Sequence, residues 1–413
     1  MTALLENLQL EPLSGEGPID AGAEEELFRD VGRQAAAAVL ARRWEGADEG
    51  EVARCRSCGQ PLQDLGLRSK EFQTLCGPLR LERRVGYCNR CGQTTASLDE
   101  RLGADQTGVT PGLRRVICRV ALELAYEPTQ GLLRDTLGFS PCSAREVERI
   151  AKRQGEGMEE ARPALREPRG QRAKKVYCLA MDGTMIPGLP DPQQHRLLWH
   201  EVKLAAVFDP RGLEASFYIA APEEADRFGR RLWRELESRN LTQDWFRLVL
   251  GDGAPWIWNL ADLHFPGIPQ LLDFYHAAEH LHQTAAALWP QGVANRWWHR
   301  RLHQLKRGEL GNFFAALQLI ARRHQTSDPE PSPQRLLRYF EENRQRLGYA
   351  EALRRKLPIG SGMVESAGRH IVQQRLKQSG MRWSLPGAQA VLNLRTRHRS
   401  GQFEQYWEDV AMA

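Results

Sequence analysis

Two pairs of closely spaced cysteines constrain the fold of this chain more than any other feature. Cys55 and Cys58 form one C-x-x-C-G motif, and Cys88 and Cys91 form a second. The glycine after each pair allows the tight turn that brings two sulfur atoms onto one ion, and four thiolates suit a tetrahedral zinc ion. The sequence therefore predicts a structural zinc module over residues 51–100. Because four thiolates fill the coordination sphere, we expect this ion to stabilise the fold and to do no chemistry.

The competing interpretation of these motifs is two disulfide bonds, which suit an oxidising compartment. The first residues lack the basic start and apolar stretch of a signal peptide, and the sequence has no uncharged apolar run of about 18 residues. We therefore expect a cytoplasmic protein with no membrane partner, in which zinc is favoured over disulfides. The remaining cysteines are expected to be packing residues: Cys76, Cys118, Cys142 and Cys178.

The length of 413 residues suggests two to four domains. Changes of composition and periodicity divide the first part of the chain into an N-terminal helical segment (1–50, with a helix over 22–44), the zinc module (51–100) and three helices that resemble a helix-turn-helix unit, with Ser143 as a cap (105–155). A charged linker follows (156–175). The rest of the chain divides into an α/β unit (176–288), an all-helical block (289–356) and a C-terminal segment (357–413) that returns to the α/β unit and has a helix over 363–377. The fold class expected is multidomain α+β.

The α/β unit is expected to contain one sheet with mixed strand pairing. Three β-rich segments come first, and strands then alternate with helices. The expected strands cover residues 176–180, 197–208, 215–220, 246–250 and 269–274, with helices over 256–263 and 275–288.

Three acidic residues stand at the ends of apolar or glycine-rich segments. Asp182 and Asp252 each follow an apolar run and precede a glycine, and Glu365 follows Gly360-Ser361-Gly362 in the first turn of a helix. Acids at one edge of a sheet can lie within a few ångströms of one another. Carboxylates this close raise one another's pKa unless cations lie between them, and oxygen ligands suit Mg²⁺ or Mn²⁺.

Each acid also has a structural interpretation. Asp-Gly pairs are common in tight turns, so Asp182 and Asp252 fit turn residues. Glu365 fits a helix-capping position or a partner for Arg369 one turn later. The joint occurrence of three such acids in one interrupted α/β unit favours a metal site.

The stretches around these acids resemble the DDE transposases of bacterial insertion sequences. They are most similar to the ISKra type and more distantly similar to Mutator-like transposases. The matching stretches are residues 181–187, 251–258, 273–281, 358–366, 373–377 and 380–384.

The resemblance implies a ribonuclease H-like catalytic domain with an all-helical insertion, in which Asp182, Asp252 and Glu365 bind two Mg²⁺ or Mn²⁺ ions. It also implies that Asp273 and His276 form a supporting element. The implied activity is metal-dependent DNA strand cleavage and strand transfer at terminal inverted repeats. The implied partners are terminal and target DNA and further copies of the chain, as a homodimer or larger oligomer associated with the bacterial nucleoid.

A basic surplus supports a polyanionic partner. Residues 296–399 hold 21 Lys and Arg against seven Asp and Glu, although the whole chain has a formal net charge of only +5. A solvated arginine-rich face is the competing interpretation, and core packing is the competing interpretation for the two tryptophans. The residues expected to contact DNA are Trp297, Trp298, Arg369, Arg375, Lys377 and Arg382.

Two other functions are compatible with parts of the sequence. His276-Ala277-Ala278-Glu279-His280 matches the H-x-x-E-H motif of inverted zinc peptidases, but this interpretation leaves the three acid motifs unexplained. A DNA-binding regulator derived from a transposase would use the zinc module and the helices and keep an inert α/β core.

Overall fold

The computed structural model describes residues 20–45, 54–55, 57–160, 176–193, 196–241, 243–324 and 331–412. The chain forms two compact units, of which unit 1 comprises Met1–Gln154 with Phe403–Ala413 and unit 2 comprises Gly155–Gln402. Within the described residues, no helix combines the length and the apolar character needed to cross a bilayer.

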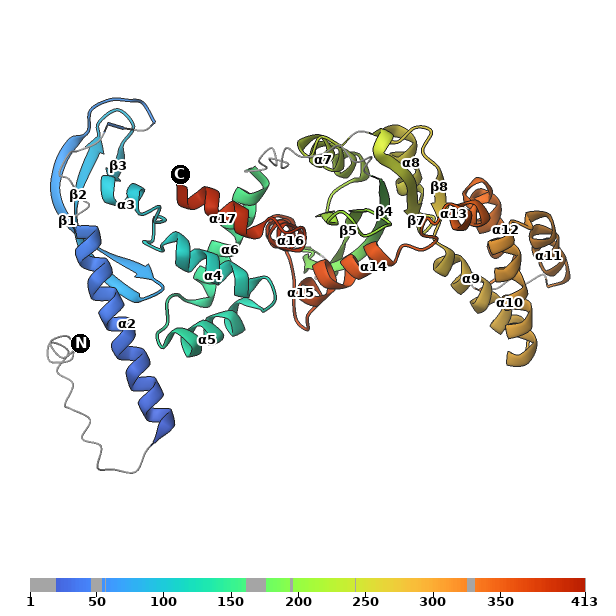
Figure 1. Ribbon diagram of the computed structural model, residues 1–413, viewed down its shortest axis with the longest axis horizontal. Coiled ribbons are helices and arrows are strands. Elements are labelled where there is room, and N and C mark those ends of the chain that lie inside the picture. The colour runs from blue at the N-terminus through green and yellow to red at the C-terminus, as the bar shows by residue number, and fades with distance from the viewer. Residues whose placement is uncertain are drawn as a thin grey trace. The chain divides into compact units, whose positions relative to one another are not determined.

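A three-stranded antiparallel sheet and a long helix form the first half of unit 1. The sheet order is β1 (Gln63–Thr74), β2 (Gly77–Cys88) and β3 (Gln93–Ala96), and α2 (Ala21–Glu45) packs against β2 (Figure 1). The predicted helix over 22–44 is confirmed. The core of this half consists of Phe72, Leu79, Leu81 and Leu98, with α2 contributing Ala37, Leu40, Ala41 and Trp44.

Three helices follow α3 (Ser97–Arg101) and agree with the predicted helical segment. They are α4 (Pro111–Ala121), α5 (Tyr126–Leu137) and α6 (Ala144–Glu160). Ser143 caps α6 reciprocally with Glu146: the Ser143 hydroxyl accepts from the Glu146 amide at 3.3 Å, and the Glu146 carboxylate accepts from the Ser143 amide at 3.0 Å. Helix α6 extends to Glu160, inside the predicted linker, and residues 161–175 lie outside the described part. The last helix, α17 (Phe403–Met412), packs against α4, so the predicted C-terminal segment over 357–413 is divided between the units.

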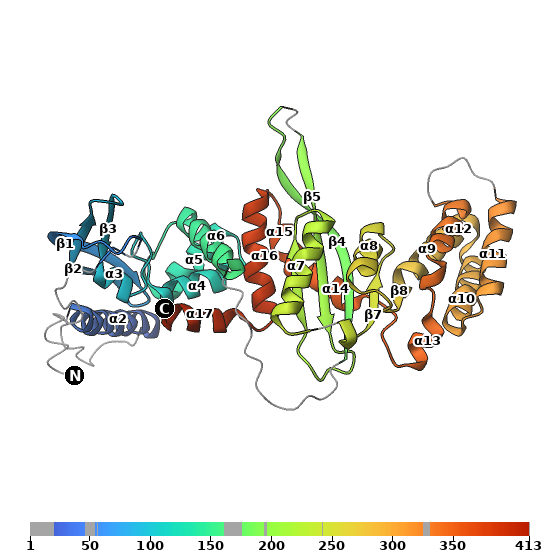
Figure 2. The ribbon, with the colours of Figure 1, turned by 90° about the horizontal axis from the view of Figure 1, so that it is seen from above.

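Unit 2 contains a five-stranded mixed sheet, as the sequence predicts. The strand order is β6-β5-β4-β7-β8, in which β6, β5 and β4 are antiparallel and β4, β7 and β8 are parallel. Helices α7 and α8 lie over one face and α14 over the other (Figures 1 and 2). The bounds are β4 (Tyr177–Pro190), β5 (Leu197–Phe208), β6 (Phe217–Ala221), α7 (Ala225–Ser238), η1 (Gln243–Trp245), β7 (Phe246–Gly251), α8 (Pro255–His264) and β8 (Gln270–Leu272).

Strand β4 is longer than predicted, and this changes the setting of Asp182. The predicted strand ends at residue 180, but β4 continues to Pro190 because β5 pairs with it along its length, with Asp182 opposite Leu204 and Gly183 opposite Lys203. Antiparallel pairing has therefore overridden the local turn preference of Asp-Gly. Asp182 is a strand residue, and the turn interpretation for it is wrong.

The block predicted to be all-helical contains helices in its described residues. Helix α9 (Phe274–Leu288) leads into it and packs against α10 and α12. The block holds α10 (Gln291–Arg307), α11 (Leu310–Arg323), α12 (Pro333–Glu342), η2 (Arg344–Arg346) and α13 (Tyr349–Arg354).

The predicted helix over 363–377 contains a π-helical turn. It begins as α14 (Gly362–Ala367), continues as the π-helix η3 (Gly368–Gln373) and ends as α15 (Gln374–Leu376). A π-turn changes which backbone carbonyls are bonded within the helix. The buried guanidinium of Arg395, on α16 (Leu385–Arg399), donates to the carbonyl oxygens of His370 and Ile371. These two backbone acceptors of the π-helical turn therefore have hydrogen-bond partners.

Candidate functional site

The four cysteines of unit 1 form a compact cluster. The Sγ atoms of Cys55, Cys58, Cys88 and Cys91 all lie within 4.8 Å of one another, and all four cysteines are free thiols. Each motif closes in the same way, because the amide of the following glycine donates to the carbonyl of the first cysteine, at 2.7 Å after Cys55 and 2.8 Å after Cys88. Both glycines have φ near +70°, a conformation that a side chain disfavours.

This cluster fits a zinc ion. Burial acts to raise the pKa of Cys55, but hydrogen bonds from the amides of Cys58 and Ser57 outweigh it and lower that pKa to about 7. A lowered pKa favours the thiolate, which is the form that binds metal. The four sulfurs could hold one zinc ion as a closed structural site.

Two of the three predicted metal-binding acids follow paired residues on neighbouring strands. Ala180 of β4 is in register with Leu250 of β7. Asp182 lies two residues further along β4, and Asp252 lies two residues after Leu250, in the turn just past the end of β7. The carboxylate of Asp252 accepts from the amide of Ala254 at 2.9 Å, which fixes the turn after β7. Glu365 lies on α14, which packs against β4 and β5.

The charges of these acids act on one another. Burial raises the pKa of Asp182 most, and the negative charges of Asp252 and Glu365 raise it further. The amide of Gly183 and the nearby His276 act in the opposite direction, and the resulting pKa of Asp182 is about 6. Asp182 is therefore half-protonated near pH 6, and a bound cation would favour its ionised form.

The three carboxylates do not form a preassembled ion cage. In the described part of the chain, the cysteine cluster is the only group of three or more metal-ligating side chains whose ligand atoms all lie within 4.8 Å of one another. Glu365 is exposed and its carboxylate accepts from the Ser361 hydroxyl at 2.9 Å. Binding one ion with all three acids therefore requires side-chain rotation, for which exposed Glu365 has room.

Asp273 links the start of α9 to the start of α14, the helix that carries Glu365. Its side chain is fully buried and caps α9, accepting from the amides of Tyr275 at 2.6 Å and His276 at 2.8 Å. Its other oxygen accepts from the amide of Ser361. The predicted supporting residue is thus a brace that holds the start of α14, and with it Glu365, against the end of β8.

The segment before Glu365 is tightly packed against α9. The amide of Phe274 donates to the carbonyl of Ile359 at 2.9 Å. A side chain at Gly360 would come within 2.5 Å of the Tyr275 ring, so glycine is required there by close approach. Ser361 was part of the sequence motif, but its links to Asp273 and Glu365 were not predicted.

The helical block reaches the candidate site through Tyr339, which the sequence analysis missed. Its hydroxyl donates to the main-chain carbonyl of Asp252 at 3.0 Å. Its ring lies 3.0 Å from where a Cβ of Gly253 would stand, and Gly253 has φ +110°. Burial and the carboxylates of Asp252 and Asp273 raise the pKa of Tyr339 well above its usual value, so the hydroxyl stays protonated. No local pattern links Tyr339 to an acid 87 residues away.

The residues predicted to contact DNA fall into two groups. Arg369, Lys377 and Arg382 are exposed, and the Lys377 ammonium donates to the Thr184 hydroxyl at 3.1 Å, two residues from Asp182. The expectation that Arg375 contacts DNA is wrong. Its side chain is fully buried over the ring of Trp383, 5.1 Å from the ring centroid, and cannot reach a phosphate from there.

The two adjacent tryptophans of α10 are half-buried. The indole N–H of Trp298 donates to the carbonyl of Ala278 on α9 at 2.9 Å. The Trp297 ring lies 5.5 Å from Trp289, and the guanidinium of Arg301 lies over it. Both side chains contribute to packing between α9 and α10.

The H-x-x-E-H motif lies on α9 without a metal-binding set around it. His280 packs its ring against Tyr339, with centroids 4.5 Å apart, and Glu279 accepts from Gln283 at 3.0 Å. Across the residues with described structure, no group of three close metal ligands includes His276 or His280. The geometry does not favour a zinc peptidase.

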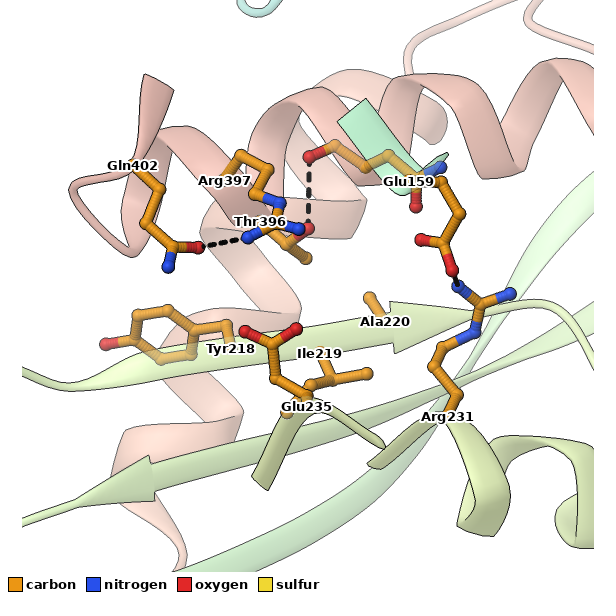
Figure 3. A pocket seen from close by; sticks show the side chains of 10 residues that line it. Glu159, Tyr218, Ile219, Ala220, Arg231, Glu235, Thr396, Arg397 and Gln402 are labelled. Atoms are coloured by element: carbon orange, nitrogen blue, oxygen red, sulfur yellow. Dashed lines mark hydrogen bonds and ion pairs between the residues drawn. The ribbon is translucent and has the colours of Figure 1, made fainter. Parts of the chain in front are cut away.

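Unit 2 also holds a small polar cavity. It lies among α6, β6, α7 and α16 and has a volume of about 20 Å³, enough for about one water molecule. The Arg231 guanidinium donates to the Glu159 carboxylate at 2.5 Å, and the Arg397 guanidinium donates to the Gln402 side-chain carbonyl at 2.7 Å (Figure 3). The first bond joins α7 to α6, and the second joins α16 to the turn that follows it.

Comparisons with known proteins add little to this geometry. No protein-family model matches the chain, and no curated protein matches it. Among solved structures, the Drosophila P element transposase strand transfer complex is similar at a TM-score of 0.28 and 10% sequence identity, over 72% of this chain and 80% of that chain. At that score the likeness carries no argument about the fold or the activity.

Proposed function

We propose that this chain is a DNA transposase of the DDE type, of the kind encoded by bacterial insertion sequences, and that unit 2 is a ribonuclease H-like catalytic domain with a helical insertion. The observation that supports the proposal is the pairing of Ala180 on β4 with Leu250 on β7, two residues before Asp182 and Asp252, together with the packing of the helix of Glu365 against β4. Burial is the main cause of the raised pKa of Asp182, and the negative charges of Asp252 and Glu365 add to it.

The proposed chemistry is cleavage of a phosphodiester followed by strand transfer. Two divalent cations, when bound, would stabilise the attacking and leaving oxygens of the scissile phosphate. Asp182, Asp252 and Glu365 would hold those cations, and Asp273 would keep the start of α14 in place. Exposed Lys377, beside Thr184, would neutralise a phosphate next to Asp182. Arg369 and Arg382 are exposed near the same segment and are proposed phosphate contacts.

The experiment uses the full chain with DNA duplexes that carry the short inverted repeats expected beside its coding region. We expect Mg²⁺-dependent strand cleavage that Asp182→Asn, Asp252→Asn and Glu365→Gln each abolish while DNA binding is retained. Asp262→Asn, at an exposed position of α8, is the matched control and should cleave normally. Unchanged cleavage in the three variants would exclude the proposal.

One observation favours the second candidate, a DNA-binding protein with an inert core. The three carboxylates do not meet the spacing of a ready metal site. That candidate predicts sequence-specific DNA binding by the parent chain, with no cleavage in Mg²⁺ or Mn²⁺.

The proposed transposase would need a dimer or larger oligomer to process two element ends. Light scattering with and without terminal DNA would measure the oligomeric state.

A further inference from the structure

We propose that the cavity between α9 and α12 binds one unpaired nucleobase of the DNA strand being processed, an inference that rests on the function proposed above. The cavity has a volume of about 380 Å³, within the range of small-ligand sites. Its lining includes His280, Gln283 and Thr284 of α9 and Arg335, Leu336 and Tyr339 of α12.

The lining suits a flat polar ring. The rings of His280 and Tyr339 lie 4.5 Å apart with a tilt of 44°, and Leu336, which is 4% exposed, adds an apolar wall. Base-binding pockets combine such stacking surfaces with groups that bond the edge of the base. The Gln283 amide oxygen and the Thr284 hydroxyl, on the α9 side of the cavity, supply acceptors and a donor for the edge of a base.

The position of the cavity links it to the candidate active site. Tyr339 forms one wall of the cavity and donates to the carbonyl of Asp252 through its hydroxyl. A base held against this ring would therefore lie close to the phosphate that the acids are proposed to bind. Arg335, exposed at the cavity, supplies a positive charge for the adjoining phosphate.

Photo-crosslinking tests the proposal without metal. The full chain in EDTA is irradiated with a single-stranded oligodeoxynucleotide that carries one 5-iododeoxyuridine, and the adduct is mapped by mass spectrometry. We expect the adduct on Tyr339 or His280. Adducts confined to other parts of the chain would overturn the proposal.

Blocking variants test the cavity itself. Leu336→Trp fills the cavity and should weaken oligonucleotide binding about tenfold and abolish the adduct. Leu319→Trp, at an exposed position of α11, is the matched control and should change neither. Should Leu336→Trp fail to fold by circular dichroism, Gln283→Trp blocks the same cavity from an exposed position. Unchanged affinity and an unchanged adduct in a folded blocking variant would contradict the proposal.

Two further arms separate the alternatives. A free deoxynucleoside monophosphate that binds as tightly as the oligonucleotide, and displaces it, would contradict the DNA strand as the source of the base. Normal Mg²⁺-dependent cleavage with no adduct in the cavity would overturn this inference and leave the proposed function standing. An adduct in the cavity with no cleavage in any metal would overturn the proposed function and leave the binding of a base in this cavity standing.

Discussion

The hydroxyl of Tyr339 donates to the main-chain carbonyl of Asp252 at 3.0 Å, which joins the helical block to the turn that follows β7. This bond and the packing of the ring on Gly253 fix the turn from outside the sheet. The helical block is therefore part of the candidate site rather than an appendage to it.

Tyr339→Phe removes this bond and keeps the ring. We expect Mg²⁺-dependent cleavage to slow by about 2- to 10-fold, the equivalent of one net hydrogen bond, and the Mg²⁺ concentration for half-maximal rate to rise. Oligonucleotide affinity should not change, because the ring remains. Tyr406→Phe is the control, since Tyr406 donates to Gln154 in unit 1 at 3.2 Å. Equal effects of the two variants on cleavage and on metal dependence would rule out the positioning role.

Asp273→Ala should destabilise unit 2 strongly. It deletes a buried carboxylate that accepts from three backbone amides, and we expect the free energy of unfolding in urea to fall by roughly 2–4 kcal/mol. Ser384→Ala is the comparison, because Ser384 caps α16 through one hydrogen bond to Gly387 and should lose about 1 kcal/mol. A loss for Asp273→Ala no larger than for Ser384→Ala would show that the Ser361 link contributes nothing.

The fold of unit 2 shows what the sequence can and cannot predict. The strand predicted over 197–208 is confirmed with the same bounds as β5. Its last five residues form a continuous apolar run, and Asp209-Pro210 marks its end. The end of β4 was misplaced because pairing with β5 is a non-local interaction that overrides Asp-Gly turn preference. Local pattern predicts elements, whereas pairing decides their ends.

The candidate site divides in the same way. The three acids were identifiable because Asp182 and Asp252 each follow an apolar run and precede a glycine, and Glu365 follows Gly360-Ser361-Gly362 in the first turn of a helix. Tyr339 bonds to Asp252 and Ser361 bonds to Asp273, and in both pairs the partners are remote in sequence. The burial of Arg375 against Trp383 could not be predicted either, because the sequence around an arginine does not show whether its side chain faces solvent or the core.

Removing the Asp182 charge should stabilise the metal-free protein at neutral pH. Its folded pKa is about 6, above the usual 3.8, so ionisation costs stability as pH rises through 6. In EDTA at pH 8, Asp182→Asn should exceed the parent in free energy of unfolding by roughly 1–3 kcal/mol, and the gain should shrink towards pH 4. Asp244→Asn, at an exposed position, should show no such pH dependence. A gain that stays constant from pH 4 to pH 8 would contradict the raised pKa.

Zinc removal should affect unit 1. We expect about one zinc per chain by elemental analysis, and Cys55→Ser or Cys88→Ser should lower this content and the thermal stability of the cysteine module. Cys76→Ser should keep the zinc, because Cys76 is not among the four clustered sulfurs. Zinc content unaffected by Cys88→Ser would contradict the assignment.

The most direct measurement is anomalous diffraction at the manganese edge from crystals of the full chain grown with Mn²⁺ and a short DNA duplex. The account predicts manganese bound by Asp182 and Asp252, with Glu365 rotated to join them. Manganese absent from these carboxylates, with the three side chains still apart in the presence of DNA, would contradict it.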